Sequence, residues 1–215
     1  QKVTLRLALQ NGESEGVTSV PVKMSLEAFL KNKAFVFIAL HGGDGENGNM
    51  QKMFDEHGIT YNGPDEKVSR LCMDKWETNK CVGDMKIPGV QATRGKAMQF
   101  AKIKHVDAEE LWKTLQKDLN AKTIIAKPRS DGCSSGVVHL YTKKDLETYI
   151  SFISAKALSI PKGTFARQRD IIEMPIGEIK NLLFERFVET DIVRAKGNKL
   201  KHIRKTGLIE ITAGV

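Results

Sequence analysis

The stretch IIAKPRSDGCSSGVVHLY at residues 124–141 decides the fold of the second half of the chain. It has a short apolar run at each end and a loop of small residues at 129–136 between them, which predicts an antiparallel hairpin. Thr142 and Asp145 follow directly and can form a capping box, so we expect a helix through about Ser154. A hairpin followed by a helix is typical of an α+β arrangement and not of a doubly wound sheet.

Lys127 ends the first of these apolar runs, and the loop that follows contains Gly132, Cys133, Ser134 and Ser135. This pattern is typical of a phosphate-binding site, because the lysine supplies positive charge and small residues let the backbone approach the phosphates. It is not a P-loop, since the pattern G-x-x-x-x-G-K-[ST] is absent. On this segment alone, an ordinary flexible hairpin loop is an alternative.

The apolar run AFVFIAL at residues 34–40 is the second informative stretch. A continuous apolar run of this length is typical of a parallel strand that is covered on both faces. The glycine-rich turn HGGDGENG at 41–48 ends it, and a helix at 49–57 and a short strand at 59–61 complete a predicted βαβ unit. Its loop lies at the carboxyl end of a strand, where open α/β sheets bind ligands.

A longer helical pattern follows at 66–81, and further on Asp107 and Glu110 can form a capping box for a helix that runs to Leu119. We therefore expect the chain to divide near residues 85–100 into an α/β unit and an α+β unit. At 215 residues, the chain is long enough for one large domain or two small ones.

The composition is that of an ordinary globular protein, with 40% apolar and 28% charged residues. No apolar run approaches the ~20 residues of a membrane span, and the first residues have neither the layout nor the cleavage site of a secretion signal. The three cysteines form no C-x-x-C pair, which indicates neither a disulfide framework nor a zinc site. A reducing compartment is the simplest interpretation, so we expect a cytoplasmic protein, or an organellar one if a transit peptide preceded Gln1.

The net charge of +8 suits an anionic partner, either a nucleotide phosphate or a nucleic acid. The basic run RAKGNKLKHIRK at residues 194–205 is the segment that favours a nucleic acid. No aromatic residue interleaves with its charges, as stacking on bases would require. We therefore interpret it as a solvated hairpin and expect no nucleic-acid partner.

The Lys-Pro pair at 127–128, followed by Gly-Cys-Ser-Ser-Gly at 132–136, resembles the lysine and the glycine-serine loop of the D-alanine–D-alanine ligases in the ATP-grasp superfamily. Further matches follow in the order of that family: FVFIALHG (35–42), GENG (45–48) with Gln51, ITYNG (59–63), MDK (73–75), IPGV (87–90) and FERFV (184–188). The resemblance covers about residues 34–215 and implies an ATP-grasp fold of α/β and α+β type. The implied parts are an amino-terminal substrate-side domain at 1–90, a central subdomain with the Gly/Ser loop at 91–188, and the start of a carboxyl-terminal grasp subdomain at 189–215.

The resemblance implies that Lys75 and Lys127 hold the α- and β-phosphates of ATP from opposite sides, while the loop closes over the β- and γ-phosphates and excludes water. Glu185 would accept a hydrogen bond from the adenine amino group, and Asp191, or else Glu189, would bind the ribose hydroxyls. The expected ATP contacts are Lys75, Lys127, Gly132, Cys133, Ser134, Ser135, Glu185, Phe187, Val188 and Asp191. Without the family, Lys75 reads as a solvated helix lysine and Glu185 as a surface carboxylate.

On the substrate side, the resemblance implies catalytic roles for His41, Glu46 and Ser134. His41 follows the apolar run directly and would face the first D-alanine, while Glu46 would order the loop around it. The expected reaction forms an acylphosphate from one D-alanine carboxylate, which the amine of a second D-alanine then attacks. The protein's task is to position groups and to neutralise the charge of the transferring phosphoryl group. Taken alone, His41 is equally consistent with a histidine satisfied by the backbone of a turn.

Two residues depart from the family within these motifs: Asn47 stands where aspartate is usual, and Cys133 stands where a loop serine is usual. A thiol is a weak donor, so a hydrogen bond made by that serine would be lost unless Ser134 takes over its role. We interpret both changes as signs of a divergent branch rather than of inactivity.

The family holds Mg²⁺ with an Asp, a Glu and an Asn on its final strands, whereas the only acids after Val188 are Glu189, Asp191 and Glu210. Magnesium needs hard oxygen ligands in near-octahedral geometry. We therefore expect ATP and Mg²⁺ as cofactors, with the Mg²⁺ ligands in a segment absent from this chain, and no ligase turnover by the chain alone. The expected partners are ATP and D-amino acids, with no membrane, and a homodimer is open because relatives are commonly dimers. The alternative function is a non-catalytic nucleotide-binding module of the ATP-grasp type.

Overall fold

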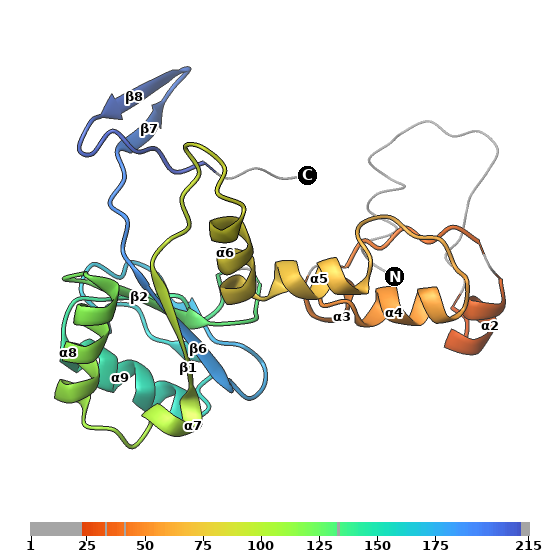
Figure 1. Cartoon of the computed structure of the whole chain (residues 1–215), viewed down its shortest axis with the longest axis horizontal. Helices are drawn as coiled ribbons and strands as arrows, with labels where there is room; N and C mark the ends of the chain where they lie inside the picture. The colour runs from red at the N-terminus through yellow and green to blue at the C-terminus, as the bar shows by residue number, and fades with distance from the viewer. Residues whose placement is uncertain (1–22, 33, 41, 133, 212–215) are drawn as a thin grey trace.

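The computed structural model describes residues 23–32, 34–40, 42–132 and 134–211. His41 and Cys133, two of the residues singled out above, lie outside this described part of the chain. A central sheet with its helices forms the body of the protein, and a series of short helices extends from it on the amino-terminal side (Figure 1). A two-stranded hairpin near the carboxyl terminus stands apart from the central sheet.

The central sheet has four antiparallel strands in the order β1-β6-β2-β3. These strands are β1 (Gly95–Gln99), β2 (Ile124–Pro128), β3 (Val138–Leu140) and β6 (Asn181–Arg186). Helices α7 (Phe100–Ile103), α8 (Ala108–Leu119) and α9 (Lys143–Ser154) contact this sheet. Helices gathered beside an antiparallel sheet are the α+β arrangement, so the class predicted for this half of the chain is confirmed.

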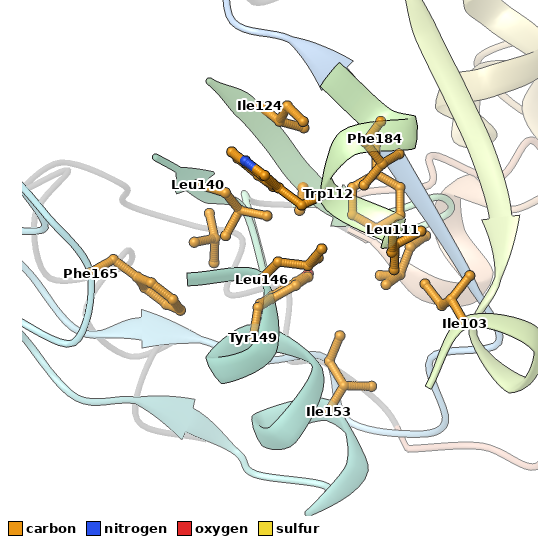
Figure 2. Packing of buried hydrophobic residues seen from close by; sticks show 14 of the residues in the cluster. Ile103, Leu111, Trp112, Ile124, Leu140, Leu146, Tyr149, Ile153, Phe165 and Phe184 are labelled. Atoms are coloured by element: carbon orange, nitrogen blue, oxygen red, sulfur yellow. The ribbon is translucent and has the colours of Figure 1, made fainter. Parts of the chain in front are cut away.

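One hydrophobic core joins these helices to the sheet (Figure 2). The helices contribute Leu111, Trp112, Leu146 and Tyr149, and the strands contribute Ile124, Leu140 and Phe184, all of them buried. Removing this apolar surface from water is the main favourable contribution to folding, so the core fixes how the strands and helices are placed.

Local signals in the sequence set where the helices of this region begin. Thr142 accepts a hydrogen bond from the Asp145 amide at 3.2 Å, and Asp145 accepts one from the Thr142 amide at 2.9 Å, so the predicted capping box is present. Asp107 likewise accepts from the Glu110 amide at 3.0 Å and caps α8. The expected hairpin is also confirmed, because β2 and β3 pair antiparallel with Ile124 opposite Leu140.

Short helices make up the amino-terminal region: α2 (Leu26–Lys31), α3 (Gly43–Glu46), α4 (Asn49–Glu56), α5 (Glu66–Met73) and α6 (Lys75–Asp84). Phe54 of α4 is fully buried, and its ring lies 6.2 Å from that of Phe29 and 5.7 Å from that of Tyr61. Gly58, shortly after α4, has a φ of 64°, which suits a glycine at the end of a helix.

The expectation of a buried strand at 34–40 is wrong. Within the described residues, this segment forms one parallel bridge, between Val36 and Tyr61, while Phe35 and Phe37 are 63% and 73% exposed. The parallel bridge still brings the two ends of the predicted βαβ unit together. An apolar run shows which side chains favour burial, but neighbouring strands must supply the surface that buries them.

The single helix expected at 66–81 is also wrong, because α5 and α6 are separate helices. Asp74 lies between them with an extended backbone, φ −85° and ψ 98°, and its side chain accepts from the amides of Trp76 and Glu77 at 3.1 Å each. An aspartate that caps a new helix offers the backbone an alternative to continuing the old one. Lys75 therefore begins a helix instead of lying in the middle of one.

The basic run near the carboxyl terminus forms an exposed hairpin of β7 (Ile192–Lys196) and β8 (Lys199–Ile203), as predicted. A second small sheet consists of β4 (Ser159–Ile160) and β5 (Ile172–Glu173). The domain boundaries at 90 and 188 stay predictions. Among the helices that the structure describes, none combines the length and the apolar character that crossing a bilayer requires.

Candidate functional site

Lys75, Lys127 and Glu185 line one cleft, although they come from three different elements. Lys75 is the first residue of α6, Lys127 lies on β2, and Glu185 lies on the neighbouring strand β6. This first cleft has a volume of about 360 Å³, and residues of α6 and the segment 91–93 complete its walls. Two lysines that are distant in the sequence thus converge, which is the geometry that a phosphate site requires.

The charges in the first cleft act on one another. Lys127 forms an ion pair with Glu185, and the two side chains are only 19% and 12% exposed. Burial and, next, the positive charge of Lys127 lower the pKa of Lys75, although Asp131, Glu185 and Asp74 oppose the shift. The Nζ of Lys75 also donates a hydrogen bond to the backbone oxygen of Asp131. Two ammonium groups repel each other in a partly dry cleft. An anion bound between them would attract both and offset this repulsion.

A polar cluster that the sequence did not reveal holds α6 against the sheet. Arg129 donates from Nε to both carboxylate oxygens of Asp74, at 2.8 and 2.9 Å, and from Nη2 to Glu77 at 2.9 Å. The amide of Lys75 donates to the backbone oxygen of Arg129 at 3.1 Å. Burial raises the pKa of Asp74, but hydrogen bonds from Arg129 and backbone amides outweigh it and lower the pKa overall. Asp74 directly precedes Lys75, and Arg129 lies two residues after Lys127. An acid beside one lysine and a base beside the other were the only signal in the sequence for this ion pair.

The two serines of the Gly/Ser loop, Ser134 and Ser135, differ in exposure and in hydrogen bonding. Ser134 is exposed and has a positive φ of 57°. Ser135 is held in place, since its amide donates to the Gly132 oxygen at 3.0 Å and its hydroxyl donates to the Glu173 oxygen at 3.3 Å. The structure therefore leaves Ser134 accessible at the surface, while it anchors the serine that follows.

The end of the loop is fixed by a glycine and a tyrosine. Gly136 has a φ of 66°, and a Cβ there would lie 2.9 Å from the Cγ of Pro128, which leaves no space for a side chain. The hydroxyl of the buried Tyr149 donates to the Gly136 oxygen at 2.7 Å. Burial raises the pKa of Tyr149, so this hydroxyl stays a donor at neutral pH.

A second cleft, of about 750 Å³, lies on the amino-terminal side and shares Cys72 and Lys75 with the first cleft. Its other walls include the segment 37–40, Glu46 of α3, Gln51 of α4, and the loop residues Asp131 and Gly132. A Cβ on Gly132 would lie 3.9 Å from the Oε2 of Glu46, so the substrate-side loop and the Gly/Ser loop approach each other here. Lys75 therefore stands at the junction of the two clefts.

Phe187 and Val188 line a third and larger cleft, of about 1470 Å³, which shares the segment 91–93 with the first. The Phe187 ring stacks on His139 with 4.0 Å between ring centroids, and His139 stacks on Tyr141 at 4.1 Å. Burial lowers the pKa of His139, so its ring is neutral at neutral pH. A supported aromatic ring beside a cleft lined by two lysines suits the face of a planar base.

Asp191, the first choice for a ribose contact, anchors the β7–β8 hairpin instead. Its carboxylate accepts from the three consecutive amides of residues 205–207 at 2.7 to 2.9 Å and contacts the Nε2 of His202 at 2.8 Å. These hydrogen bonds hold the pKa of Asp191 far below its usual value, and those from the backbone amides have the largest effect. Glu189, the alternative, lines the third cleft. The ribose role of Asp191 has no support in this geometry and stays a prediction.

No protein-family model matches the chain. Among curated proteins, a D-alanine–D-alanine ligase from Listeria welshimeri is 28% identical over 176 residues, which cover 80% of this chain and 45% of that ligase. D-alanine–D-alanine ligase A from Bacillus cereus is 32% identical over 124 residues, which cover 58% of this chain and 38% of that ligase. The chain thus spans less than half the length of these two curated relatives.

Solved structures give the same result for the fold. A D-alanine–D-alanine ligase from Bacillus anthracis matches 88% of this chain and 53% of its own, with a TM-score of 0.55 at 22% identity. A structure of D-alanine–D-alanine ligase from the same organism complexed with ATP matches with a TM-score of 0.53 at 20% identity, over 87% of this chain and 56% of its own. The fold is therefore that of the ATP-grasp ligases. Within this class, the relatives by sequence are D-alanine–D-alanine ligases, so the resemblance of the chain to that family is confirmed.

Proposed function

We propose that this chain forms the ATP-binding part of a ligase that joins a carboxylate to an amine, with D-alanine as the first substrate. The observation that carries the proposal is the cleft in which Lys75, Lys127 and Glu185 meet. The relatives named D-alanine–D-alanine ligase support the type of reaction, and the relative complexed with ATP supports the nucleotide.

In this proposal, the polyphosphate of ATP lies between Lys75 and Lys127. Lys127 exchanges its ion pair with Glu185 for a phosphate oxygen, because a polyphosphate carries more negative charge than one carboxylate. The released Glu185 accepts a hydrogen bond from the adenine amino group, and the backbone at Phe187 and Val188 completes the adenine contacts. Nucleotide binding thus replaces an internal ion pair with two contacts to the ligand.

The Gly/Ser loop covers the terminal phosphates in the proposed complex. Gly132, Cys133, Ser134 and Ser135 make up this part of the loop, and their small side chains suit a close approach of the backbone to phosphate oxygens. The exposed position of Ser134 leaves its hydroxyl accessible for the same purpose. On the substrate side, His41 faces the first D-alanine and Glu46 orders the adjoining loop.

The proposed reaction has two steps. The carboxylate of the first D-alanine attacks the γ-phosphorus of ATP, so that ADP leaves and an acylphosphate forms. The amine of the second amino acid then attacks the acyl carbon, loses a proton, and expels inorganic phosphate as the peptide bond forms. The first and second clefts meet at Lys75, so the carboxylate and the γ-phosphate are brought together at the residue that also neutralises their charge.

Magnesium is expected to accompany ATP, but the described part of the chain does not fit it. No three His, Cys, Asp or Glu side chains gather into a metal site within those residues. Asp74, a carboxylate beside the first cleft, is engaged by Arg129, and Glu185 in the wall of that cleft is assigned to the adenine amino group. No step of the proposed reaction is therefore routed through a metal ion.

Nucleotide binding tests the proposal. ADP at about 100 times its Kd stabilises a protein by about 2.7 kcal/mol, which corresponds to roughly 5 to 10 °C in melting temperature for a chain of this length. We expect Lys127→Ala to remove most of this gain, whereas Lys144→Ala, which changes an exposed lysine on α9, leaves it intact. No shift at millimolar ADP in the unaltered chain would contradict the proposal.

A further inference from the structure

His139 of β3 lies on the same face of the central sheet as Lys127 and Glu185, two residues of the first cleft. In the register of the sheet, Ile125 of β2 lies opposite Glu185 of β6 on one side and opposite His139 on the other. Directly opposite residues have side chains on one face, and Lys127 follows two residues after Ile125. Among the described residues that line the first, second and third clefts, however, His139 does not occur. It can therefore act on a ligand only through a neighbour.

The neighbour that joins His139 to a cleft is Phe187, which lines the third cleft. The two rings stack with 4.0 Å between their centroids and 30° between their planes. Phe187 is 38% exposed, so its ring is supported by the histidine and is still accessible from the cleft. An exposed aromatic side chain without such support can occupy more than one rotamer, and stacking on His139 selects one of them.

His139 is itself held from two directions. Its ring also stacks on Tyr141 at 4.1 Å, and the guanidinium of Arg167 lies 5.5 Å from the centroid of the Tyr141 ring. Its Nε2 contacts the hydroxyl of Thr123 at 2.8 Å, and the backbone oxygen of Thr123 accepts from the Phe187 amide at 3.5 Å. Thr123 thus contacts both members of the stacked pair, so the histidine is fixed relative to the backbone of Phe187 as well as to its ring.

We propose that His139 is a positioning residue for the nucleotide base, and that it acts by stacking on the ring of Phe187. The inference rests on the proposed function, in which the backbone at Phe187 and Val188 contacts adenine. Lys127 lies toward the opposite end of β2 from Thr123, and Lys75 lies on α6. Loss of the stack should therefore affect the contacts to the base and leave the contacts to the phosphates intact.

The test compares ADP with inorganic pyrophosphate, which carries phosphates but no base. Isothermal titration calorimetry of the full chain measures the Kd of each ligand. We expect His139→Leu, which removes the aromatic face, to weaken ADP binding about threefold to tenfold and to leave pyrophosphate binding unchanged. His139→Phe restores an aromatic face, so it should bind ADP as the unaltered chain does. His105→Ala removes an exposed histidine between α7 and α8, serves as the control, and should change neither Kd.

A double-mutant cycle decides whether His139 acts through Phe187. In a chain that carries Phe187→Ala, His139→Leu should weaken ADP binding no further, because the ring that the histidine supports is absent. A merely structural role of His139 predicts instead the same loss in both backgrounds, together with a loss of pyrophosphate binding. His139→Gln, which has no ring but can keep a hydrogen bond to Thr123, gives the same cycle if circular dichroism shows that the leucine variant does not fold.

The inference alone would be overturned by full ADP affinity in His139→Leu, by an equal loss for ADP and pyrophosphate, or by an undiminished loss in the Phe187→Ala background. A phenylalanine variant as weak as the leucine variant would also overturn it, because the stack would then not be the contact that matters. If the unaltered chain binds pyrophosphate but binds ADP no more tightly, the base contact at Phe187 is wrong while the phosphate site of the proposed function stands. If the unaltered chain binds neither ligand, the proposed function is wrong and the inference with it.

Discussion

The central sheet and the amino-terminal region differ in how completely each buries its own apolar side chains. In the central region, strands and helices enclose a core in which Tyr149 and Phe184 have no exposed surface. In the amino-terminal region, Phe54 is enclosed in the same way, but Phe37 and Leu40 are 73% and 56% exposed and face the second cleft. The central region is thus stabilised by its own residues, whereas exposed apolar side chains of the other region line a cleft.

The largest predicted effect is on the free energy of unfolding when the central core is truncated. Phe184→Ala removes a fully buried ring from β6, and we expect it to cost about 3–5 kcal/mol, because a cavity adds to the lost burial. Phe35→Ala, at a residue that is 63% exposed, should change the same free energy by less than about 0.5 kcal/mol. Urea unfolding followed by circular dichroism measures both. Similar losses of unfolding free energy in the two variants would show that the two regions do not differ in this way.

The second prediction concerns the cluster that joins the two regions. Asp74→Ala removes the cap of α6 and leaves the partly buried Arg129 without this partner, so we expect a loss of about 2–3 kcal/mol in unfolding free energy. Because Lys75 is displaced with α6, the stabilisation by ADP should fall as well. The matched control is Glu147→Ala, which breaks an exposed ion pair with Lys144 on α9 and should cost less than about 0.5 kcal/mol. An Asp74 variant with full ADP stabilisation would show that this cluster does not position Lys75.

Much of the central region could be predicted from its sequence because its signals are local. The capping box at Thr142, the cap at Asp107 and the apolar run that forms β2 each act within a few residues, and each is present in the structure. The burial of 34–40 could not be predicted in the same way, because it depends on strands that the segment itself does not encode. The signal that separates α5 from α6 is also local, because it is the capping side chain of Asp74. The apolar pattern at 66–81, however, predicts one continuous helix through this residue.

The candidate site shows the same division between local and distant causes. The lysine and the small-residue loop were recognisable because they lie on one strand and the turn after it. The pairing of Arg129 with Asp74 and the stacking of His139 under Phe187 join elements that lie far apart in the sequence. Asp191 was singled out by its order in the chain, but order alone does not show that backbone amides already surround its carboxylate.

The third prediction uses the shared wall of the two clefts. Cys72 is exposed and lines both clefts, whereas Cys81 on α6 lines neither. If ADP fills the first cleft, alkylation of Cys72 by iodoacetamide should slow by the fraction of chain left unbound, roughly tenfold at ten times the Kd. Mass spectrometry of the alkylated peptides measures both cysteines at once, and Cys81 should react at an unchanged rate. Equal protection of the two thiols would indicate a general stiffening of the chain and not a ligand beside Cys72.

The smallest predicted effect concerns the β7–β8 hairpin, which is separate from both regions compared above. The pKa of Asp191 is lower in the folded chain than in the unfolded one, so its hydrogen bonds stabilise the hairpin fully above about pH 4 and are lost as the pH falls toward the folded value. The protection factors for hydrogen exchange of the amides at 205–207, taken relative to the intrinsic rate at each pH, should therefore fall in acid, and in Asp191→Asn they should be low already at neutral pH. The amides of β2 and β6 serve as the internal control, because their protection depends on the central core and not on this carboxylate. Loss of protection in both places at the same pH would mean that the hairpin and the central sheet unfold as one unit.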